Sequence, residues 1–219
     1  MRRNLSPVLI ANMSLRLDWC SHEAAKYAVE HWHYSKCLPI GKLVKIGVWE
    51  ESEYIGCLIF SYGASPQIGK PYSLKQTEIC ELTRVALTNH NTKVSRIIAI
   101  ALRMLREFCP KLHLVISFAD PIHDHHGGIY QAGGWIYVGE STAKPLLVLA
   151  NGKMQHNRLY QGRNGAKLPI GSHWTEPSSK YKYLMPLDEE MKQRILPLSK
   201  PYPKRASSET SSRSTSVES

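Results

Sequence analysis

The sequence predicts a single α/β domain in which a mixed central sheet is flanked by helices. Three observations support this fold class. The apolar run from Leu114 to Phe118 is typical of a strand buried on both faces. Apolar residues in Val94–Phe108 recur at steps of four and three, which indicates an amphipathic helix. Two strand candidates, Val44–Trp49 and Tyr54–Phe60, precede them. Strands and helices therefore mix along the chain, as in an α/β protein.

The first elements expected along the chain are a helix and a hairpin. Ser21–His33 predicts a helix, because Ser21 can cap it and its apolar residues share one face. The basic, proline-broken segment Tyr34–Leu43 is expected to form a loop. A polar turn, Glu50–Glu53, then joins the two strand candidates, so we expect these strands to pair antiparallel.

The middle of the chain predicts a strand–helix–strand unit. Glu78–Leu87 alternates well enough to form a strand, and Leu112–Phe118 follows the helix Val94–Phe108. A helix between two strands of one sheet implies a right-handed crossover. We therefore expect these two strands to pair in parallel.

The later segments carry weaker signals. Asp120-Pro121 ends the buried strand, because proline blocks its continuation. A short amphipathic helix is expected at Ile129–Ala132, followed by an apolar strand at Trp135–Val138. Pro145–Leu149 is a further strand candidate, and the basic, Gly-rich Met154–Trp174 is expected to be an extension or loop.

Length and composition bound the organisation of the chain. The 219 residues are enough for one domain, which is expected at 21–198. Residues 1–20 are expected to form an N-terminal extension or first strand, and the Ser/Thr-rich tail at 199–219 is expected to be disordered. No apolar run is long enough to span a bilayer, and the N-terminus lacks a convincing secretion signal. Five widely spaced cysteines without a CxxC pair exclude a disulfide framework. We expect a cytoplasmic protein without membrane contact.

The charge of the chain favours a polyanionic partner. The net charge is +10, and the tail 206–219 contributes −1, which leaves +11 on the remainder. Such a surplus on one domain is typical of nucleic-acid-binding proteins, although it also fits simple solubility.

Several residues are expected at the carboxyl ends of the parallel strands, where such sheets place their functional groups. Arg84 could bind substrate, or pair internally with Glu78 or Glu81. Ser95 and Arg96 open a helix whose free N–H groups could hold a phosphate or carboxylate, or could form an ordinary helix start.

Two further residues belong to the segment Leu112–Glu140. Asp120 could act as a general base or metal ligand beside the run His123–His126, or could merely cap a turn. Tyr130 could donate a proton, or could be a core aromatic.

Aromatic, imidazole and cationic side chains gather where the first helix meets its loop. His33, Tyr34, Trp32 and Lys36 lie in this segment. Stacking on an extruded base and contact with phosphate would use such residues. The alternative is an aromatic helix end followed by solvated lysines.

With these residues considered together, the chain resembles the Mom family of bacteriophage DNA-modification proteins. The strand–loop–Tyr-helix–strand order after Leu112 also resembles the C-terminal half of a GNAT (N-acetyltransferase-type) fold. The family resemblance covers about Lys26 to Leu187. Its matching stretches are HWHYSKCLPIGKLVKIGVWE (His31–Glu50), EICELTRVAL (Glu78–Leu87), SFADPIHDHHGGIYQAGGWIYVG (Ser117–Gly139) and KYLMPLD (Lys182–Asp188).

The resemblance implies a GNAT-like transferase that converts adenine in double-stranded phage DNA to N6-carbamoylmethyladenine, which protects that DNA from host restriction enzymes. The catalytic set it implies is His33, Tyr34, Arg84, Ser95, Asp120 and Tyr130. Residues expected to bind the cofactor or donor are Arg84, Ser95 and Arg96, and those expected to bind DNA are Trp32, Lys36, Lys42 and Lys45, with Arg158 and Arg163 as further basic residues.

One departure from acetyltransferases concerns the donor. Their pyrophosphate loop follows an R/Q-x-x-G-x-G/A pattern, whereas Leu87–Val94 contains no glycine. Standard coenzyme A binding is therefore in doubt, and the donor is left open between an acyl-CoA-like molecule and another glycine-derived compound. The resemblance also suggests iron, for which His33 and Asp120 are the expected ligands.

Two rival functions remain open from the sequence. One is a conventional acyl-CoA-dependent N-acetyltransferase, against which the glycine-free loop argues. The other is a basic DNA-binding protein without catalysis, whose aromatic residues only pack the core. A homodimer is also left open.

Overall fold

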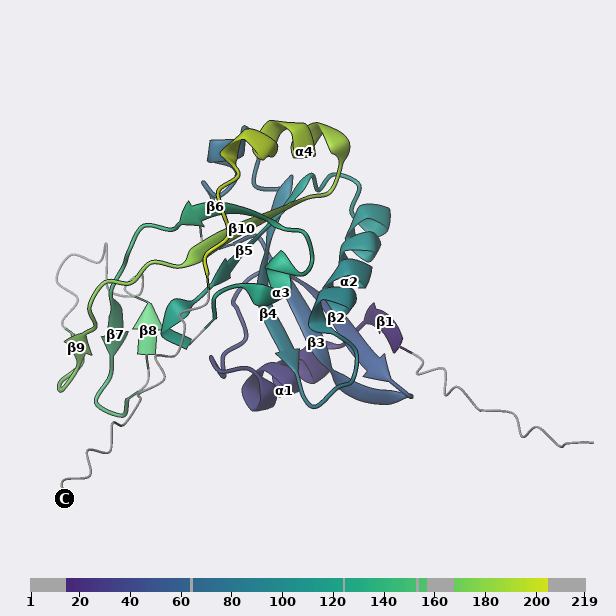
Figure 1. The fold of residues 1–219 in the computed structure, drawn as a ribbon. Coiled ribbons are helices and arrows are strands. Elements are labelled where there is room, and N and C mark those ends of the chain that lie inside the picture. The colour runs from purple at the N-terminus through teal and green to yellow at the C-terminus, as the bar shows by residue number, and fades with distance from the viewer. Residues whose placement is uncertain (1–14, 64, 124, 153, 157–167, 205–219) are drawn as a thin grey trace, which may run out of the picture.

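The computed structural model describes residues 15–63, 65–123, 125–152, 154–156 and 168–204. A seven-stranded sheet with the order β1-β2-β3-β4-β5-β10-β6 forms its centre, and a smaller sheet, β8-β7-β9, lies to one side (Figure 1). The strands are β1 (Leu15–Trp19), β2 (Leu43–Glu50), β3 (Glu53–Ser61), β4 (Ile79–Leu87), β5 (Leu114–Ala119), β6 (Ile136–Glu140), β7 (Leu146–Val148), β8 (Met154–His156), β9 (His173–Trp174) and β10 (Tyr181–Pro186). The α-helices are α1 (His22–Trp32), α2 (Val94–Phe108), α3 (Gly128–Gln131) and α4 (Glu189–Ile195).

The mixed sheet predicted from the sequence is confirmed. Strands β1 to β4 pair antiparallel in succession, and β4 pairs in parallel with β5 across the helix α2. The parallel pair is the crossover expected from the strand–helix–strand pattern. The structure is thus a mixed sheet flanked by helices, as the sequence predicted.

One central strand, β10, is not predicted by the sequence. It inserts between β5 and β6 and runs antiparallel to both. The predicted strand Trp135–Val138 corresponds to β6, which therefore lies at the edge of the sheet. The expected loop Met154–Trp174 contains the short strands β8 and β9, and 157–167 lie outside the described residues.

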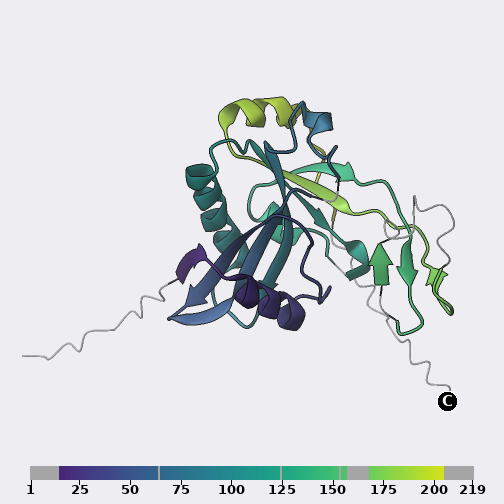
Figure 2. The same cartoon turned by 180° about the vertical axis from the view of Figure 1, so that it is seen from behind.

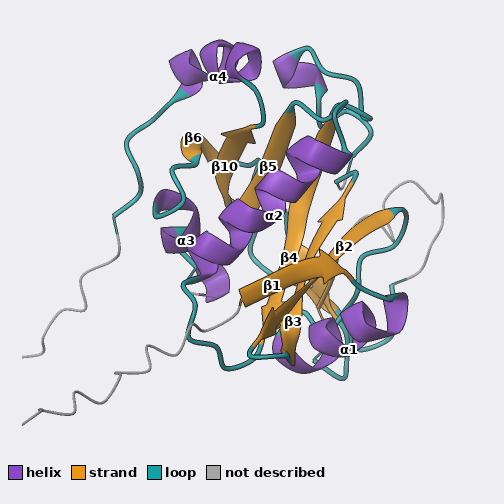
Figure 3. Ribbon diagram, turned by 90° about the vertical axis from the view of Figure 1, so that its right-hand side faces the viewer, coloured by secondary structure: helices purple, strands orange, loops and turns teal. Residues whose placement is uncertain are grey.

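The helices cover both faces of the central sheet. Figure 3 shows α2 and α3 lying across one face, and Figure 2 shows α1, in purple, on the opposite side. Helix α2 buries Ile97, Ala101 and Leu105 against the largest core cluster, to which Tyr130 of α3 also belongs. Helix α1 packs Ala25 and Val29 against the reverse face, where α4 closes a third cluster with Ile195. We call these the α2 face and the α1 face.

The start of the predicted C-terminal tail packs against this domain. The backbone N–H of Lys200 donates to the carbonyl of Tyr137 at 2.8 Å, and the Tyr202 hydroxyl donates to the carbonyl of Trp135 at 2.7 Å. Residues 1–14 and 205–219 lie outside the described part of the chain. In that described part, no helix is long and apolar enough to cross a membrane.

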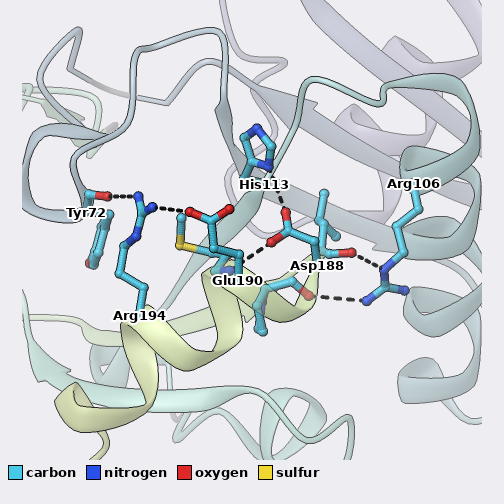
Figure 4. A network of polar contacts seen from close by, with 9 residues as sticks. Tyr72, Arg106, His113, Asp188, Glu190 and Arg194 are labelled. Carbon is cyan, nitrogen blue, oxygen red and sulfur yellow. Dashed lines mark hydrogen bonds and ion pairs between the residues drawn. The ribbon is translucent and has the colours of Figure 1, made fainter.

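Helix α4 is held in place by polar contacts (Figure 4). Asp188 caps the helix, with Oδ1 accepting from the Met191 N–H at 2.8 Å and Oδ2 lying 2.7 Å from His113 Nδ1. The Arg106 guanidinium of α2 donates to the carbonyl of Leu187 at 3.0 Å. These contacts bind α4 to segments that lie far away in the sequence.

Asp188→Ala is expected to lower the free energy of unfolding by about 1 kcal/mol, because a helix cap and its histidine contact are lost. Burial acts to raise the pKa of Asp188, but the hydrogen bonds from Met191 and His113 outweigh it and hold that pKa below its ordinary value. The stabilisation is therefore present above the pKa of the unfolded chain and is lost as pH falls through the folded pKa.

Urea unfolding at neutral pH and at successively lower pH measures this effect. The difference in the free energy of unfolding between wild type and Asp188→Ala should disappear at low pH. The matched control is Glu189→Gln, which changes an exposed carboxylate in the same helical turn and should cost less than about 0.5 kcal/mol. An equal loss in both variants would contradict the capping role.

Candidate active site

A β-bulge in β4 determines where Arg84 points. Ile59 pairs with Arg84 and Phe60 pairs with Leu82, so Thr83 is an extra residue without a partner position on β3. Bulges of this kind re-aim the side chains that follow them. Because Ile59 packs under α1, its cross-strand partner Arg84 is turned to the α1 face instead of the α2 face that Leu82 occupies.

The Arg84 guanidinium joins β4 to the loop after α1. Its Nη1 donates to the Thr83 carbonyl at 2.7 Å, and its Nε donates to the Cys37 carbonyl at 3.3 Å. Among the described residues, no ion pair includes Arg84, so the internal pairing considered from the sequence is not the arrangement seen. Burial lowers the pKa of Arg84, while nearby Tyr34, Cys37 and Glu81 act to raise it. Arg84 is thus a partly buried cation beside the loop that carries Tyr34.

His33 and Tyr34 stand at the C-terminal end of α1. His33 is 8% exposed, and its Nδ1 lies 2.8 Å from Ser35 Oγ and 3.1 Å from the Ser35 N–H. A backbone N–H can only donate, so Nδ1 acts as its acceptor. The Tyr34 ring is 48% exposed and lies between two imidazoles, 4.3 Å from the His33 centroid and 5.5 Å from that of His125. The fold therefore joins the HWHYS stretch to the HDHH stretch.

Asp120 is a buried carboxylate with both oxygens engaged. It is 4% exposed, its Oδ2 lies 2.7 Å from Lys180 Nζ, and its Oδ1 accepts from the Ile122 N–H at 3.1 Å. Sequence reasoning missed Lys180, although it lies just before the KYLMPLD stretch. The ion pair satisfies a charge that would otherwise be costly to bury.

Tyr130 lies in the core with its hydroxyl beside a serine. The residue is 7% exposed, and its hydroxyl lies 2.8 Å from Ser117 Oγ. Ser117 Oγ also donates to the Leu82 carbonyl at 2.8 Å, which uses its single hydrogen, so the Tyr130 hydroxyl is the donor between the two. Burial raises the pKa of Tyr130 to about 12. Tyr130 is therefore protonated at neutral pH, and its proton is directed at Ser117.

The N–H groups before α2 are already occupied by a carboxylate. Glu50, 7% exposed at the end of β2, accepts from the Asn91 N–H at 2.9 Å and from the Thr92 N–H at 2.7 Å. Burial acts to raise the pKa of Glu50, but these hydrogen bonds outweigh it and hold that pKa below its ordinary value. The sequence offered no signal for this contact.

The N–H groups of Asn91 and Thr92, in the glycine-free loop, are therefore not open to the pyrophosphate of an acyl-CoA. A pyrophosphate that used them would have to displace Glu50, whose carboxylate would repel its charge. Ser95 and Arg96 begin the helix directly behind this loop. Their role in holding a donor stays a prediction.

The predicted site residues thus fall into distinct groups. His33 contacts Tyr34, Arg84 contacts the loop that carries Tyr34, and Tyr34 and Glu81 both act on the pKa of Arg84 and of Tyr130. No contact among the described residues joins Ser95 or Arg96 to that group.

The residues expected to bind DNA differ in exposure. Lys36 and Lys42 are exposed, Lys45 is partly buried, and Trp32 packs against the cluster under α1. Arg158 and Arg163 lie outside the described residues.

Glu50→Ala is expected to open an anion site before α2. Two backbone N–H groups lose a charged acceptor, so the free energy of unfolding should fall by about 1–3 kcal/mol. Inorganic pyrophosphate should recover part of this loss by binding the freed N–H groups, while wild type should not respond. Thermal unfolding with and without pyrophosphate, together with the amide NMR shifts of Asn91 and Thr92, measures both effects. Glu53→Ala is the matched control, and equal pyrophosphate responses in all three proteins would contradict the assignment.

Comparison with known proteins places the chain among relatives. A curated protein of Escherichia phage Mu, "Methylcarbamoylase mom", is 27% identical over 206 residues, covering 87% of this chain and 84% of that protein. Solved structures with similar folds include an N-acyl amino acid synthase from uncultured soil microbes (TM-score 0.47, 11% identity, 80% of this chain and 92% of that chain). Another is an N-acetyltransferase from Staphylococcus aureus (TM-score 0.43, 10% identity, covering 80% of this chain and 98% of that chain).

The family comparison covers most of the chain, including every strand of the central sheet. The model of the Mom protein family matches residues 14–204. This range contains the Arg84, Asp120 and Tyr130 positions that the resemblance singled out. The chain belongs to the Mom protein family.

Proposed function

We propose that this protein is a transferase that converts adenine in double-stranded phage DNA to N6-carbamoylmethyladenine and so protects that DNA from host restriction enzymes. The observation that carries the proposal is the contact of Arg84 with the loop that carries Tyr34, through the Cys37 carbonyl, in a chain of the Mom family. Tyr34 also acts on the pKa of both Arg84 and Tyr130. The relative from phage Mu, named as a methylcarbamoylase, supports the same class of reaction.

The DNA is expected to meet the α1 side of the molecule. Lys36 and Lys42 are exposed in the loop after α1, beside the exposed ring of Tyr34. The N6 atom of adenine can enter an enclosed site only if the base leaves the duplex. Tyr34 is the exposed aromatic at this position, and it would stack on the extruded base.

Proton transfer is assigned to two buried groups. The exocyclic amine of adenine is a weak nucleophile and has to lose a proton as the new N–C bond forms. Asp120 would accept that proton, which requires Lys180 to release one carboxylate oxygen. Tyr130, held protonated by burial, would donate to the leaving group, which requires its hydroxyl to leave Ser117, and Arg84 would hold a negative group of the donor.

The donor is expected to be a glycine-derived compound, since Glu50 occupies the N–H groups that a CoA pyrophosphate would need. Iron remains a prediction. In the described part of the chain no three His, Cys, Asp or Glu side chains converge as a metal site, and both oxygens of the expected ligand Asp120 are engaged. No step of the mechanism is therefore assigned to iron.

Arg84→Ala and Asp120→Asn are each expected to reduce the modification of adenine about 100-fold or more, because a charge that acts in the transition state is lost. Expression in bacteria, digestion of plasmid DNA to nucleosides and mass spectrometry measure the product. Circular dichroism confirms that the variants fold.

The matched control is Arg103→Ala, which removes an exposed arginine from α2 and should leave modification unchanged. Wild-type levels of modified adenine in the Arg84 or Asp120 variant would contradict these roles. No new nucleoside with the wild-type protein would contradict the proposed function and favour the two rival functions.

Replacing Lys36, Lys42 and Lys45 together by glutamine is expected to weaken DNA binding and to lower its salt dependence. Each lost phosphate contact reduces the slope of log K against log[salt] by about 0.9, so the change should be about 2 to 3. Fluorescence anisotropy with duplex DNA at several salt concentrations measures this slope. A control with Lys75, Lys111 and Lys192 changed to glutamine keeps the net charge equal. Equal slopes in the two triple variants would contradict a defined DNA-binding surface, because only the total charge of the protein would then matter.

A further inference from the structure

A cavity of about 250 Å³ lies on the α1 face of the central sheet. Its floor is formed by Ile116 and Phe118 of β5, and the loop that contains Tyr72 forms one wall. Glu81 of β4 and Lys182 of β10 line it from either side, and Thr142 follows β6 at its rim. The cavity therefore combines an apolar floor with two opposite charges.

The two charges stand across β5 from each other. Glu81 pairs in register with Ile116, and Lys182 pairs with Phe118. Neighbouring strands lie about 4.8 Å apart, so the Cα atoms of Glu81 and Lys182 are separated by roughly 10 Å or more. No ion pair between them exists among the described residues. A small molecule with a charge at each end fits between them.

The Lys182 end of the cavity is suited to an anion. Lys182 is partly buried, and its pKa is lowered by burial and by the nearby ammonium group of Lys200. A bound anion would favour the charged form of Lys182 and so oppose both effects on its pKa. Ser141 also lines this end; its Oγ accepts from the Lys180 N–H at 3.0 Å, so its hydroxyl hydrogen can be given to a ligand.

The Glu81 end lies on the side of the proposed reaction centre. The bulge at Thr83 puts Glu81 and Arg84 on the same face of β4, and Glu81 acts on the pKa of both Arg84 and Tyr130. Gln67 lines the same part of the cavity and adds amide hydrogen-bonding groups. A carboxylate with an adjacent amide oxygen is suited to bind an ammonium group.

We propose that this cavity binds a small α-amino acid, with its carboxylate at Lys182 and its ammonium group at Glu81. Ile116 and Phe118 would contact the carbon atoms of the ligand. The inference rests on the proposed function in one respect: it identifies the cavity as the entry site for the glycine-derived donor or its amino-acid precursor. It also agrees with Glu50, which occupies two of the N–H groups before α2 that a phosphate-bearing donor could use.

The test uses the full chain without DNA and glycine as the probe. Isothermal titration calorimetry, supported by NMR shifts of residues in β5 and β10, measures binding. Wild type should bind glycine saturably. Acetate, which lacks the ammonium group, and glycinamide, which lacks the carboxylate, should each bind about tenfold or more weakly.

Lys182→Met should weaken glycine binding about tenfold or more, because it keeps the apolar stem and removes the charge. Glu81→Gln should do the same from the other end of the cavity. Lys192→Met, an exposed lysine of α4, is the matched control and should bind like wild type. Thermal unfolding of all variants separates lost binding from lost folding.

Two outcomes would overturn the inference: the absence of saturable glycine binding, or acetate binding as tightly as glycine with no effect of Glu81→Gln. The proposed function has a separate readout in the nucleosides of plasmid DNA. Modified adenine without glycine binding would overturn the cavity assignment alone, while glycine binding without modified adenine would support the cavity and overturn the proposed reaction.

Discussion

The extra residue at Thr83 is the constraint on which the site depends. Without it, strict alternation along β4 would place Arg84 on the same face as Leu82, inside the core under α2. The bulge turns Arg84 to the α1 face, which Glu81 already occupies through its pairing with Ser61. A cation and a carboxylate three residues apart therefore reach the same centre, where the loop after α1 supplies Tyr34 and the Cys37 carbonyl.

Local patterns predicted most of the fold, because most strands and helices are specified by their own residues. The helix α2 has the predicted bounds. Because it connects β4 to β5 as a crossover, these two strands pair in parallel. The insertion of β10 could not be predicted in this way. Its position between β5 and β6 is decided by pairing with strands that lie far earlier in the chain. The strands of the second sheet, β7 to β9, separate β10 from them in the sequence.

The same distinction applies to the candidate site. Arg84, Asp120 and Tyr130 were identified by residue type, by their place near strand ends and by the resemblance to a family. Their partners were not, because each contact joins distant segments: Lys180 to Asp120, Ser117 to Tyr130 and Glu50 to Thr92. The bulge is equally invisible in the sequence, since it exists only in the register between β3 and β4. A sequence can therefore indicate candidate functional groups, while long-range register decides how they are held.

The distribution of charge over the two faces argues for one direction of approach. On the α2 face, helices α2 and α3 cover the sheet, and Glu50 occupies the N–H groups where an anionic donor would otherwise bind. On the α1 face lie Arg84, Glu81 and the cavity with Lys182. Tyr130 belongs to the α2 face, where its hydroxyl contacts Ser117. DNA and donor would then meet on the α1 face, and Tyr130 would have to leave Ser117 and reach them between β4 and β5, whose pairing ends at Glu81 and Ile116.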